Sequence, residues 1–454
     1  MDKIQLLQER KAKLKEASKD IRSRIQAIID TDSFVELSAF SFSKNDFYGE
    51  ETTGEGVVTG FATIGGSPFY IVAQNHKVAL GGVSKANCDK IVKCLELAEK
   101  NSTPVVYLLN TQGVQVGEGV TVLEGLGKLL AKATALKGIV SQFVIVDGEV
   151  YGSAALLSAI ADFTFFVEKK SVLAINSPFV ISAKAGKNLA KEEVGSAKAL
   201  DKTGVTSFVI GDIAEARDKI AYINEIVSVP VMDAELNDSQ PVLNVQSDAQ
   251  TILTIFDSVL EINSTYAPEV KTVIGRVGGI SLAAVIFDGG EEGVSISASK
   301  LAKVKDFAEF ARAFSLPFVT FNDTKGICAC SCVNNSRVMK EASGYLELLG
   351  MMDAPKIAVV YKKAIGLGYT LFASKSVGFD YTCAFANAKI ALFDSVQGAQ
   401  IELGNENIDK AKLAEKYADE NADPINAAKD GYIDAIIEPE FVKQYLVSAI
   451  QMLS

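Results

Sequence analysis

Residues 60–75 read GFATIGGSPFYIVAQN, and residues 275–288 read GRVGGISLAAVIFD. In both stretches a pair of adjacent glycines precedes an apolar run that ends at a polar residue, which is typical of a turn followed by a buried strand. A serine-led helical stretch follows each run and stops just before a proline, Pro104 or Pro317, that opens another apolar strand. The common order of turn, strand, helix and strand indicates that one structural unit occurs twice.

The distance in sequence between matching residues is nearly constant. Pro317 follows Pro104 by 213 positions (317 − 104), and Gly326 follows Gly113 by the same 213. Chance would rarely keep so many turn residues at one offset, so the chain is predicted to carry two copies of one domain from an internal duplication. Later pairs drift slightly, as one or two insertions would produce: 214 between Gly152 and Gly366, and 218 between Asp162 and Asp380.

A polar connection is expected between the copies. The stretch VMDAELNDSQPVLNVQSD at 231–248 contains Pro241 and shows no sustained apolar period. We therefore expect an N-terminal domain at 1–235, which includes a leading helix, and a C-terminal domain at 249–454.

Two helical stretches lie outside the repeat. The leading helix runs from Ile4 to Ile28 with an apolar stripe, and a shorter counterpart is expected at 249–262. The polar face of the leading helix carries charges of both signs, which favours packing across the domains over membrane binding.

Apolar strands alternate with helices inside each copy. The first copy suggests strands at 105–109, 141–146 and 164–167, with helices at 121–135 and 151–161. This alternation predicts an α/β fold with largely parallel strands and right-handed crossovers. An open doubly wound sheet and a spiral of short ββα units both fit the pattern.

Composition narrows the class of protein. The chain has 454 residues and a net charge of −11, without basic runs, so nucleic acid is not an expected partner. Residues 1–28 lack the apolar core of a signal peptide, and no apolar segment is long enough to span a bilayer. Six cysteines in a chain of this length do not suggest a disulfide framework, so a cytoplasmic protein is expected.

Side chains that commonly carry catalysis are scarce. The single histidine, His76, has no G-x-S-x-G partner and is interpreted as a structural or loop residue. Neither a dinucleotide fingerprint nor a phosphate-binding P-loop is present. Cys328, Cys330 and Cys332 form a C-x-C-x-C run, but metal-site spacing and a histidine partner are absent. We interpret them as small residues of a tight loop and predict no metal site.

Glycine turns are the remaining candidates for chemistry. They occur in four places where a strand leads toward a helix: 111–115, 150–154, 324–327 and 364–369. Glycine lets a ligand approach the main chain closely, and two facing turns can form an oxyanion hole from backbone N–H groups alone. The alternative is that they are ordinary strand-to-helix turns.

Several segments, taken in order, resemble a known family. They resemble the β-subunit-like carboxyltransferases of biotin-dependent carboxylases, a family that includes propionyl-CoA and acetyl-CoA carboxylases and subunits of glutaconyl-CoA and methylmalonyl-CoA decarboxylases. The resemblance runs from about Leu6 to the C-terminus. It rests on FVEL at 34–37, GVVTG at 56–60, the Gly113 loop with Glu118-Gly119, ADFTFFV at 161–167, LPFVT at 316–320, KAIGLGY at 363–369, ASK at 373–375 and ANAKIA at 386–391.

This resemblance implies two crotonase-like domains, each a spiral of ββα units, in a homo-oligomer. Acyl-CoA would bind mainly the N-terminal domain, and carboxybiotin would enter from the C-terminal domain of a neighbouring subunit. One oxyanion hole would hold the thioester carbonyl and the other the biotin ureido oxygen. The implied residues are Gly152 and Ser153 with Gly113, Val114 and Gln115 for the first hole, Gly366, Leu367 and Gly368 with Gly326 and Ile327 for the second, and Thr370 near the acyl pocket.

The resemblance also implies the partners. No biotin-bearing lysine between methionines is present, so biotin would sit on a separate biotin carboxyl carrier protein. A biotin carboxylase or a decarboxylase complex is a further candidate partner. The acyl group, the direction of carboxyl transfer and the size of the oligomer are not predicted.

Four residues depart from the pattern of the family: Gln112, Gln115, Lys325 and Leu367. The first two replace a glycine and an arginine, which weakens the expected hold on an anionic substrate. A second hypothesis is therefore a catalytically degenerate paralogue that acts as a non-catalytic assembly subunit. A third is a hydratase or hydrolase of the wider crotonase group that uses Glu118 and Glu149.

Overall fold

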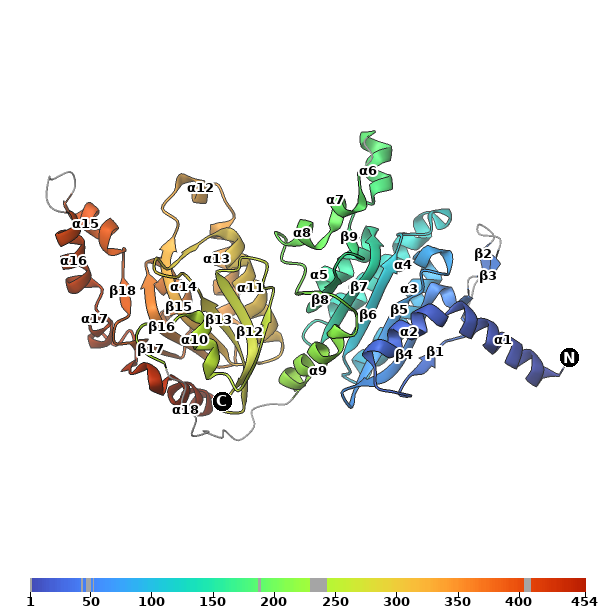
Figure 1. The fold of residues 1–454 in the computed structure, drawn as a ribbon, viewed down its shortest axis with the longest axis horizontal. Coiled ribbons are helices and arrows are strands. Elements are labelled where there is room, and N and C mark those ends of the chain that lie inside the picture. The colour runs from blue at the N-terminus through green and yellow to red at the C-terminus, as the bar shows by residue number, and fades with distance from the viewer. Residues whose placement is uncertain are drawn as a thin grey trace. The chain divides into compact units, whose positions relative to one another are not determined.

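The computed structural model describes residues 2–41, 44, 45, 50, 51, 53–186, 189–228, 243–403 and 410–454. The chain divides into two compact units, Met1–Glu225 (unit 1) and Ile226–Ser454 (unit 2), coloured blue to green and green to red in Figure 1. The predicted domains 1–235 and 249–454 would meet around residues 229–242, which lie outside the described residues. Their exact division stays a prediction.

Unit 1 is built on an eight-stranded sheet in the order β1-β4-β5-β6-β7-β8-β10, with β9 paired to β7. The first three strands are antiparallel, and the others run parallel from β5 onward. A separate hairpin pairs β2 with β3. The strands are β1 (Val35–Leu37), β2 (Lys44–Asn45), β3 (Glu50–Glu51), β4 (Val57–Ile64), β5 (Ser67–Gln74), β6 (Val105–Thr111), β7 (Gln142–Tyr151), β8 (Phe163–Val167), β9 (Val172–Ala174) and β10 (Phe208–Ile210).

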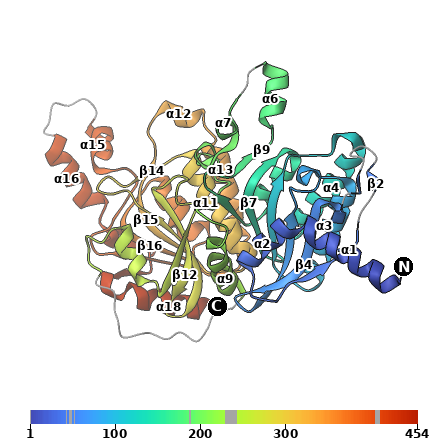
Figure 2. The same cartoon turned by 45° about the vertical axis from the view of Figure 1, so that its right-hand side comes forward.

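Helices cover both faces of this sheet. α3 and α4 contact each other, as Figure 2 shows, and their apolar residues form one core with those of β4 to β7. Among the described residues, every helix is too short or too polar to cross a lipid bilayer. The helices of this part are α1 (Lys3–Ala17), α2 (Lys19–Ile28), α3 (Lys85–Lys100), α4 (Val120–Ala135), α5 (Leu156–Ile160), α6 (Pro178–Ala185), α7 (Lys191–Gly195), α8 (Ala197–Leu200) and α9 (Glu215–Ser228).

Unit 2 repeats the plan with a nine-stranded sheet in the order β11-β12-β13-β15-β16-β17-β19. β14 pairs with β15, and β18 pairs with β16. Its strands are β11 (Ser258–Ile262), β12 (Val270–Val277), β13 (Ile280–Phe287), β14 (Val294–Ile296), β15 (Phe318–Ile327), β16 (Lys356–Ile365), β17 (Tyr381–Phe385), β18 (Lys389–Ala391) and β19 (Ala435–Ile437). Its helices are α10 (Ala249–Ile252), α11 (Ala298–Ala313), α12 (Ser331–Asn334), α13 (Val338–Gly350), α14 (Leu367–Phe372), α15 (Ser395–Leu403), α16 (Lys410–Asn421), α17 (Pro424–Lys429) and α18 (Val442–Leu453).

The two units match element by element, which confirms the duplicated α/β fold. β4 and β12, β5 and β13, α3 and α11, and β6 and β15 each begin 213 positions apart, for example 318 − 105. β7 and β16 begin 214 positions apart (356 − 142). Even the helix caps match, because the hydroxyl of Ser84 accepts the N–H of Asn87 and that of Ser297 accepts the N–H of Lys300.

Two buried lysines repeat in the same way. Lys90 donates to the carbonyl oxygens of Gly54 and Val57, and Lys303 donates to those of Asn263 and Tyr266. Burial lowers the pKa of each ammonium group to about 8. Because a buried lysine donates to two carbonyl oxygens in both units, the duplication extends to buried polar contacts.

The helices outside the repeat differ from the expectation. α2 buries Ile21, Ile25 and Ile28 and contacts β5 of its own unit, whereas α1 has no buried residue, so its packing across the domains stays a prediction. The helix expected at 249–262 ends early, and its last five residues form β11, which pairs with β12. There, pairing with the edge of β12 determines the conformation, although the short apolar pattern predicted a helix.

Candidate active site

In unit 1 the ends of β6 and β7 bring two glycine turns together. The strands run parallel and pair as far as Thr111 and Val150. Beyond them, Gly113 (φ 112°) and Gly152 (φ 74°) both have positive φ, which suits glycine and strains other residues. A Cβ added to Gly152 would lie 4.0 Å from the Cα of Gly113, so the two backbones lie side by side.

Hydrogen bonds decide which amides of the Gly152 turn stay available. The N–H of Gly152 donates to the carbonyl oxygen of Ile175 at 3.1 Å, so Gly152 turns the chain but does not offer its own donor. Ser153 follows in the 3₁₀ turn Gly152–Ala155, whose first amides lack partners within the turn. Within the described residues, the Ser153 N–H donates no hydrogen bond to the protein backbone.

The Gly113 turn leaves a second donor beside the first. Its own N–H donates to the hydroxyl of Thr111 at 3.1 Å, and its carbonyl accepts the N–H of Val83 at 2.9 Å. The N–H of Gln115 donates to the carbonyl of Val83 at 2.9 Å. Because backbone groups alternate in direction along a strand, the N–H of Val114 points away from Val83, and it has no acceptor among the described residues.

The side chain of Gln115 points under the turn. It is buried, and its Nε2 donates to the carbonyl oxygen of Gly82 at 3.2 Å. The role in substrate binding that the resemblance implies for Gln115 stays a prediction, because this geometry gives it a supporting contact.

Polar side chains surround the turns of unit 1. Nε2 of Gln112 donates to Oε2 of Glu149 at 2.9 Å, and Nζ of Lys191 lies 3.0 Å from its Oε1. Burial acts to raise the pKa of Glu149, but these hydrogen bonds outweigh it and hold the pKa below its usual value. Tyr151, buried beside Gly152, has a raised pKa because of burial and the Glu149 charge, so its hydroxyl stays protonated.

The corresponding turns meet in unit 2. Gly326 (φ 82°) lies near the end of β15, and Gly366 (φ 53°) precedes α14. A Cβ added to Gly368 would lie 3.5 Å from the N atom of Gly326 and 2.2 Å from Oγ1 of Thr324. The first turn of α14 therefore packs directly on the Gly326 turn.

The amides of unit 2 repeat those of unit 1. The N–H of Gly366 donates to the carbonyl oxygen of Ala391 at 2.8 Å, as Gly152 does to Ile175. Leu367 and Gly368 open α14, so the helix itself provides no acceptor for their N–H groups. Ile327 pairs with Ile296 of β14 in the place that Val114 and Val83 occupy in unit 1.

The side chains around the turns of unit 2 carry positive charge. Lys325, equivalent to Gln112 by the offset of 213, lies with Nζ 3.0 Å from Oε2 of Glu292. Lys363, equivalent to Glu149 by the offset of 214, donates to the carbonyl oxygens of Glu291 and Glu292. Burial lowers the pKa of Lys363.

Two further predicted residues lie on the first turn of α14. Leu367 is 50% exposed, so its side chain lies at the surface of unit 2 beside the turn. Thr370 is half-buried, and its N–H donates to the carbonyl oxygen of Gly366 at 3.3 Å. The implied influence of Thr370 on acyl size stays a prediction.

Sequence reasoning missed part of this surrounding shell. It singled out Gln112 and Lys325 separately and did not pair them with Glu149 and Lys363 on the neighbouring strands. The constant offset contained the signal, since it aligns the two pairs. The cysteine-rich stretch also differs from its interpretation as small loop residues, because Cys330 and Cys332 form a disulfide.

Comparisons with known proteins agree with one another. The family described as "Carboxyl transferase domain" matches residues 12–454. The methylmalonyl-CoA decarboxylase subunit alpha of Veillonella parvula is 28% identical, covering 100% of this chain and 96% of that protein. The putative propionyl-CoA carboxylase beta chain of Bacillus subtilis is also 28% identical, covering 95% of this chain and 90% of the relative.

A solved structure shares the fold. The transcarboxylase 12S structure with bound methylmalonyl-coenzyme A and methylmalonic acid superimposes with a TM-score of 0.90. The superposition covers 99% of this chain and 95% of the transcarboxylase chain. At 24% sequence identity it establishes the crotonase-like fold and no more.

Proposed function

Because this chain belongs to the carboxyl transferase domain family, and is thus an enzyme of the biotin-dependent acyl-CoA carboxyltransferase class, we propose that it moves a carboxyl group between biotin on a separate carrier protein and a short acyl-CoA. The observation that carries the proposal is the repeated pairing of glycine turns. In each unit, two turns with positive φ meet, and some of their amides have no protein acceptor among the described residues.

The first pair of donors would act on the acyl-CoA. The N–H groups of Val114 and Ser153 would hold the thioester oxygen as it gains negative charge, because donors fixed before the reaction need no reorganisation. Gly113 and Gly152 would act by shaping the turns, since their own N–H groups are engaged.

The second pair would act on biotin. Biotin bound there would supply the ureido nitrogen at which the carboxyl group is exchanged, in either direction, for the α-proton of the acyl group. The N–H groups of Leu367 and Gly368, with Ile327, would hold the ureido oxygen, and Gly326 and Gly366 would shape the turns. The lysines near these turns favour a ligand that carries a carboxylate.

Partners follow from the same proposal. A biotin carboxyl carrier protein would bring biotin, with a biotin carboxylase or a decarboxylase complex as its source, and the enzyme would act as a homo-oligomer. The alternative of a non-catalytic assembly subunit is not favoured, because all four turn glycines keep positive φ despite the changes at Gln112, Gln115, Lys325 and Leu367.

The direct test is carboxyl transfer by the full chain. Methylmalonyl-CoA and malonyl-CoA are offered with free biotin, and we expect loss of the carboxyl group from the thioester that depends on biotin. Calorimetry with the same thioesters provides a control for binding. Absence of turnover with every short acyl-CoA, despite measurable binding, would contradict the proposal.

A further inference from the structure

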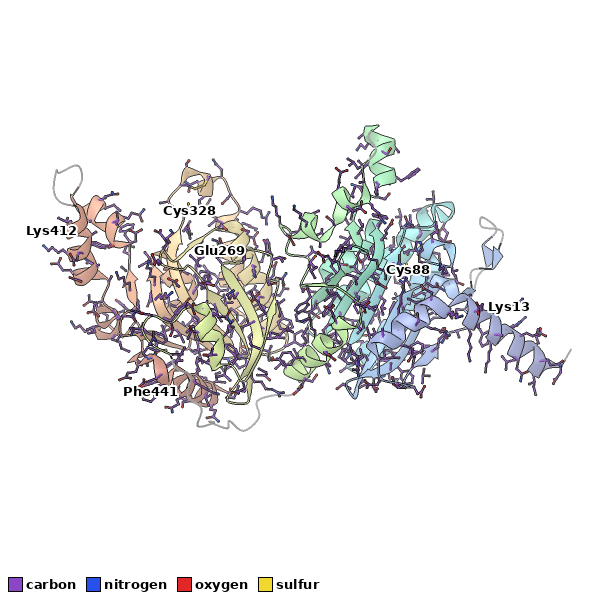
Figure 3. All side chains as sticks on the ribbon, viewed as in Figure 1. Lys13, Cys88, Glu269, Cys328, Lys412 and Phe441 are labelled. Carbon is purple, nitrogen blue, oxygen red and sulfur yellow. A yellow bond between two sulfur atoms is a disulfide. The ribbon has the colours of Figure 1, made fainter. Side chains whose placement is uncertain are left out.

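The loop that follows β15 carries three cysteines within five residues. β15 ends at Ile327, and Cys328 comes next with an exposed side chain, labelled beside α12 in Figure 3. Cys330 and Cys332 are joined by a disulfide with a Cα–Cα distance of 5.3 Å. The sulfur cluster therefore begins directly after the residue that we place at the biotin side of the site.

The other three cysteines form the contrast. Cys88, Cys94 and Cys383 are buried, and burial raises the pKa of each thiol to about 12. A buried thiol of that kind is inert toward thiol–disulfide exchange. Cys328 and Cys332 are exposed, and Cys330 is partly so, which makes these the accessible cysteines of the described chain.

The disulfide contributes little to holding the fold. In the chain-entropy account, a disulfide stabilises by restricting the unfolded chain, and the effect grows with the length of the loop that it closes. Here the bonded residues are separated by 2 positions, so a very short segment is restrained. Stabilisation of the fold is thus a poor explanation for this solvent-exposed disulfide.

Metal binding explains the cluster no better. Among the described residues, no group of three or more His, Cys, Asp or Glu side chains is arranged to hold a metal ion. With two of the three sulfurs already bonded to each other, Cys328 alone of this cluster keeps a thiol, which is too few ligands for a metal ion.

We propose that Cys330 and Cys332 form a reversible redox site, opened by a dithiol reductant and closed by the corresponding disulfide. A thiolate of the dithiol attacks one sulfur of the pair, and the other sulfur leaves as a thiolate and takes a proton. The second thiol of the reductant then attacks the mixed disulfide, releasing the second cysteine. Two electrons pass to the protein disulfide, and the dithiol ends as a disulfide.

The position of the loop links this site to the proposed active site. Ile327 at one end of the loop pairs with Ile296, and at the other end Val338 is buried at the start of α13. Inside the loop, the N–H of Val333 donates to the carbonyl oxygen of Cys330 across the turn that the disulfide closes. Opening the ring releases this turn, so Gly326 and Ile327 lose a restraint; this consequence for turnover rests on the proposed function.

The test begins without an activity assay. The full chain is equilibrated in buffers with graded ratios of dithiothreitol to its oxidised form, its thiols are alkylated, and the peptides are weighed. We expect one transition in which Cys330 and Cys332 become alkylated together, as the bond between them requires. Cys328→Ser serves as the matched control and should keep this transition, whereas Cys330→Ser should abolish it.

Hydrogen exchange of the full chain gives the second readout. Reduction should speed exchange in the segment from Gly326 to Val333, while β6 and β7 of unit 1 stay unchanged, and Cys330→Ser should show the fast exchange in every buffer. The proposal is overturned if both cysteines remain alkylatable across the whole series, or if Cys328→Ser removes the transition. These outcomes are independent of whether carboxyl transfer is observed.

Discussion

A Cβ added to Gly113 in unit 1 would lie 3.8 Å from the nearest atom, the carbonyl oxygen of Tyr151, which is ordinary contact. Added to the equivalent Gly326 in unit 2, it would lie 3.0 Å from the carbonyl oxygen of Ile365. Gly152 and Gly366 differ in the same direction. The duplication thus preserved the turns but packed the turn glycines of unit 2 more tightly against neighbouring backbone than those of unit 1.

Charge around the turns separates the units further. Gln112 and Glu149 in unit 1 correspond to Lys325 and Lys363 in unit 2. The backbone donors are the shared part, and the side chains around them are the part that differs. This division is what two different ligands, one at each unit, would require.

The largest expected effect comes from Gly368→Ala. The new Cβ would lie 2.2 Å from Oγ1 of the buried Thr324, whereas the equivalent residue of unit 1, Ala154, already carries a methyl group. Overpacking of this kind should lower the free energy of unfolding of unit 2 by about 3 kcal/mol. Hydrogen exchange of β16 amides measures it, with Gly127→Ala, where no atom lies within 4 Å, as the control. Unchanged exchange of the β16 amides in Gly368→Ala would contradict the tighter packing of unit 2 at this position.

The second largest effect is expected from Asp323→Asn. This change gives unit 2 the residue that unit 1 has at the equivalent position, Asn110. Burial raises the pKa of Asp323 to about 6 in the folded protein, above its value of 3.8 in a model compound. The folded state therefore binds the proton more tightly, so stability falls as pH rises from about 4 to 6.

We expect wild-type unit 2 to lose about 2 kcal/mol of stability over this range relative to Asp323→Asn. Urea unfolding of both proteins at pH 4, 5, 6 and 7 measures the difference. A gap between them that does not change with pH would show that Asp323 is not held in its protonated form by burial.

The smallest expected effect concerns the matched glycines. Gly113→Ala and Gly326→Ala both place alanine at positive φ, at a cost of about 1 kcal/mol each. The close contact at Gly326 should add about 1 kcal/mol more. Gly66→Ala, at φ 81° with no atom within 4 Å, measures the cost of positive φ alone. Equal destabilisation by Gly113→Ala and Gly326→Ala would show that the two glycines are packed equally tightly.

The sequence was sufficient for the duplication and for the pairing of the turns, because glycine and proline hold their places in both copies. It was insufficient for the lengths of the strands. β7 was expected to end at Val146 and runs to Tyr151, and β15 runs to Ile327 although a turn was predicted at 324–327. Polar and glycine residues predicted turns there, but β9, β14 and β18 provide strand partners that local pattern does not reveal.

The same limit applies to the site. Gly152 and Gly366 were expected to donate their own N–H groups, and distant carbonyl oxygens of Ile175 and Ala391 already accept them. Which amide is occupied depends on residues that are brought near only by folding. The bond between Cys330 and Cys332 escaped prediction because the composition argued for free thiols.

The central claim is that single backbone N–H groups carry the chemistry, and proline tests it directly. Leu367 is the first residue of α14, where proline fits and removes only an N–H that the helix does not use. The measurement is kcat for biotin-dependent carboxyl transfer in Leu367→Pro, with Leu367→Ala as the control that keeps the N–H. We predict a loss of about 10²–10³-fold for proline and a rate near wild type for alanine. Equal rates in the two variants would contradict the account.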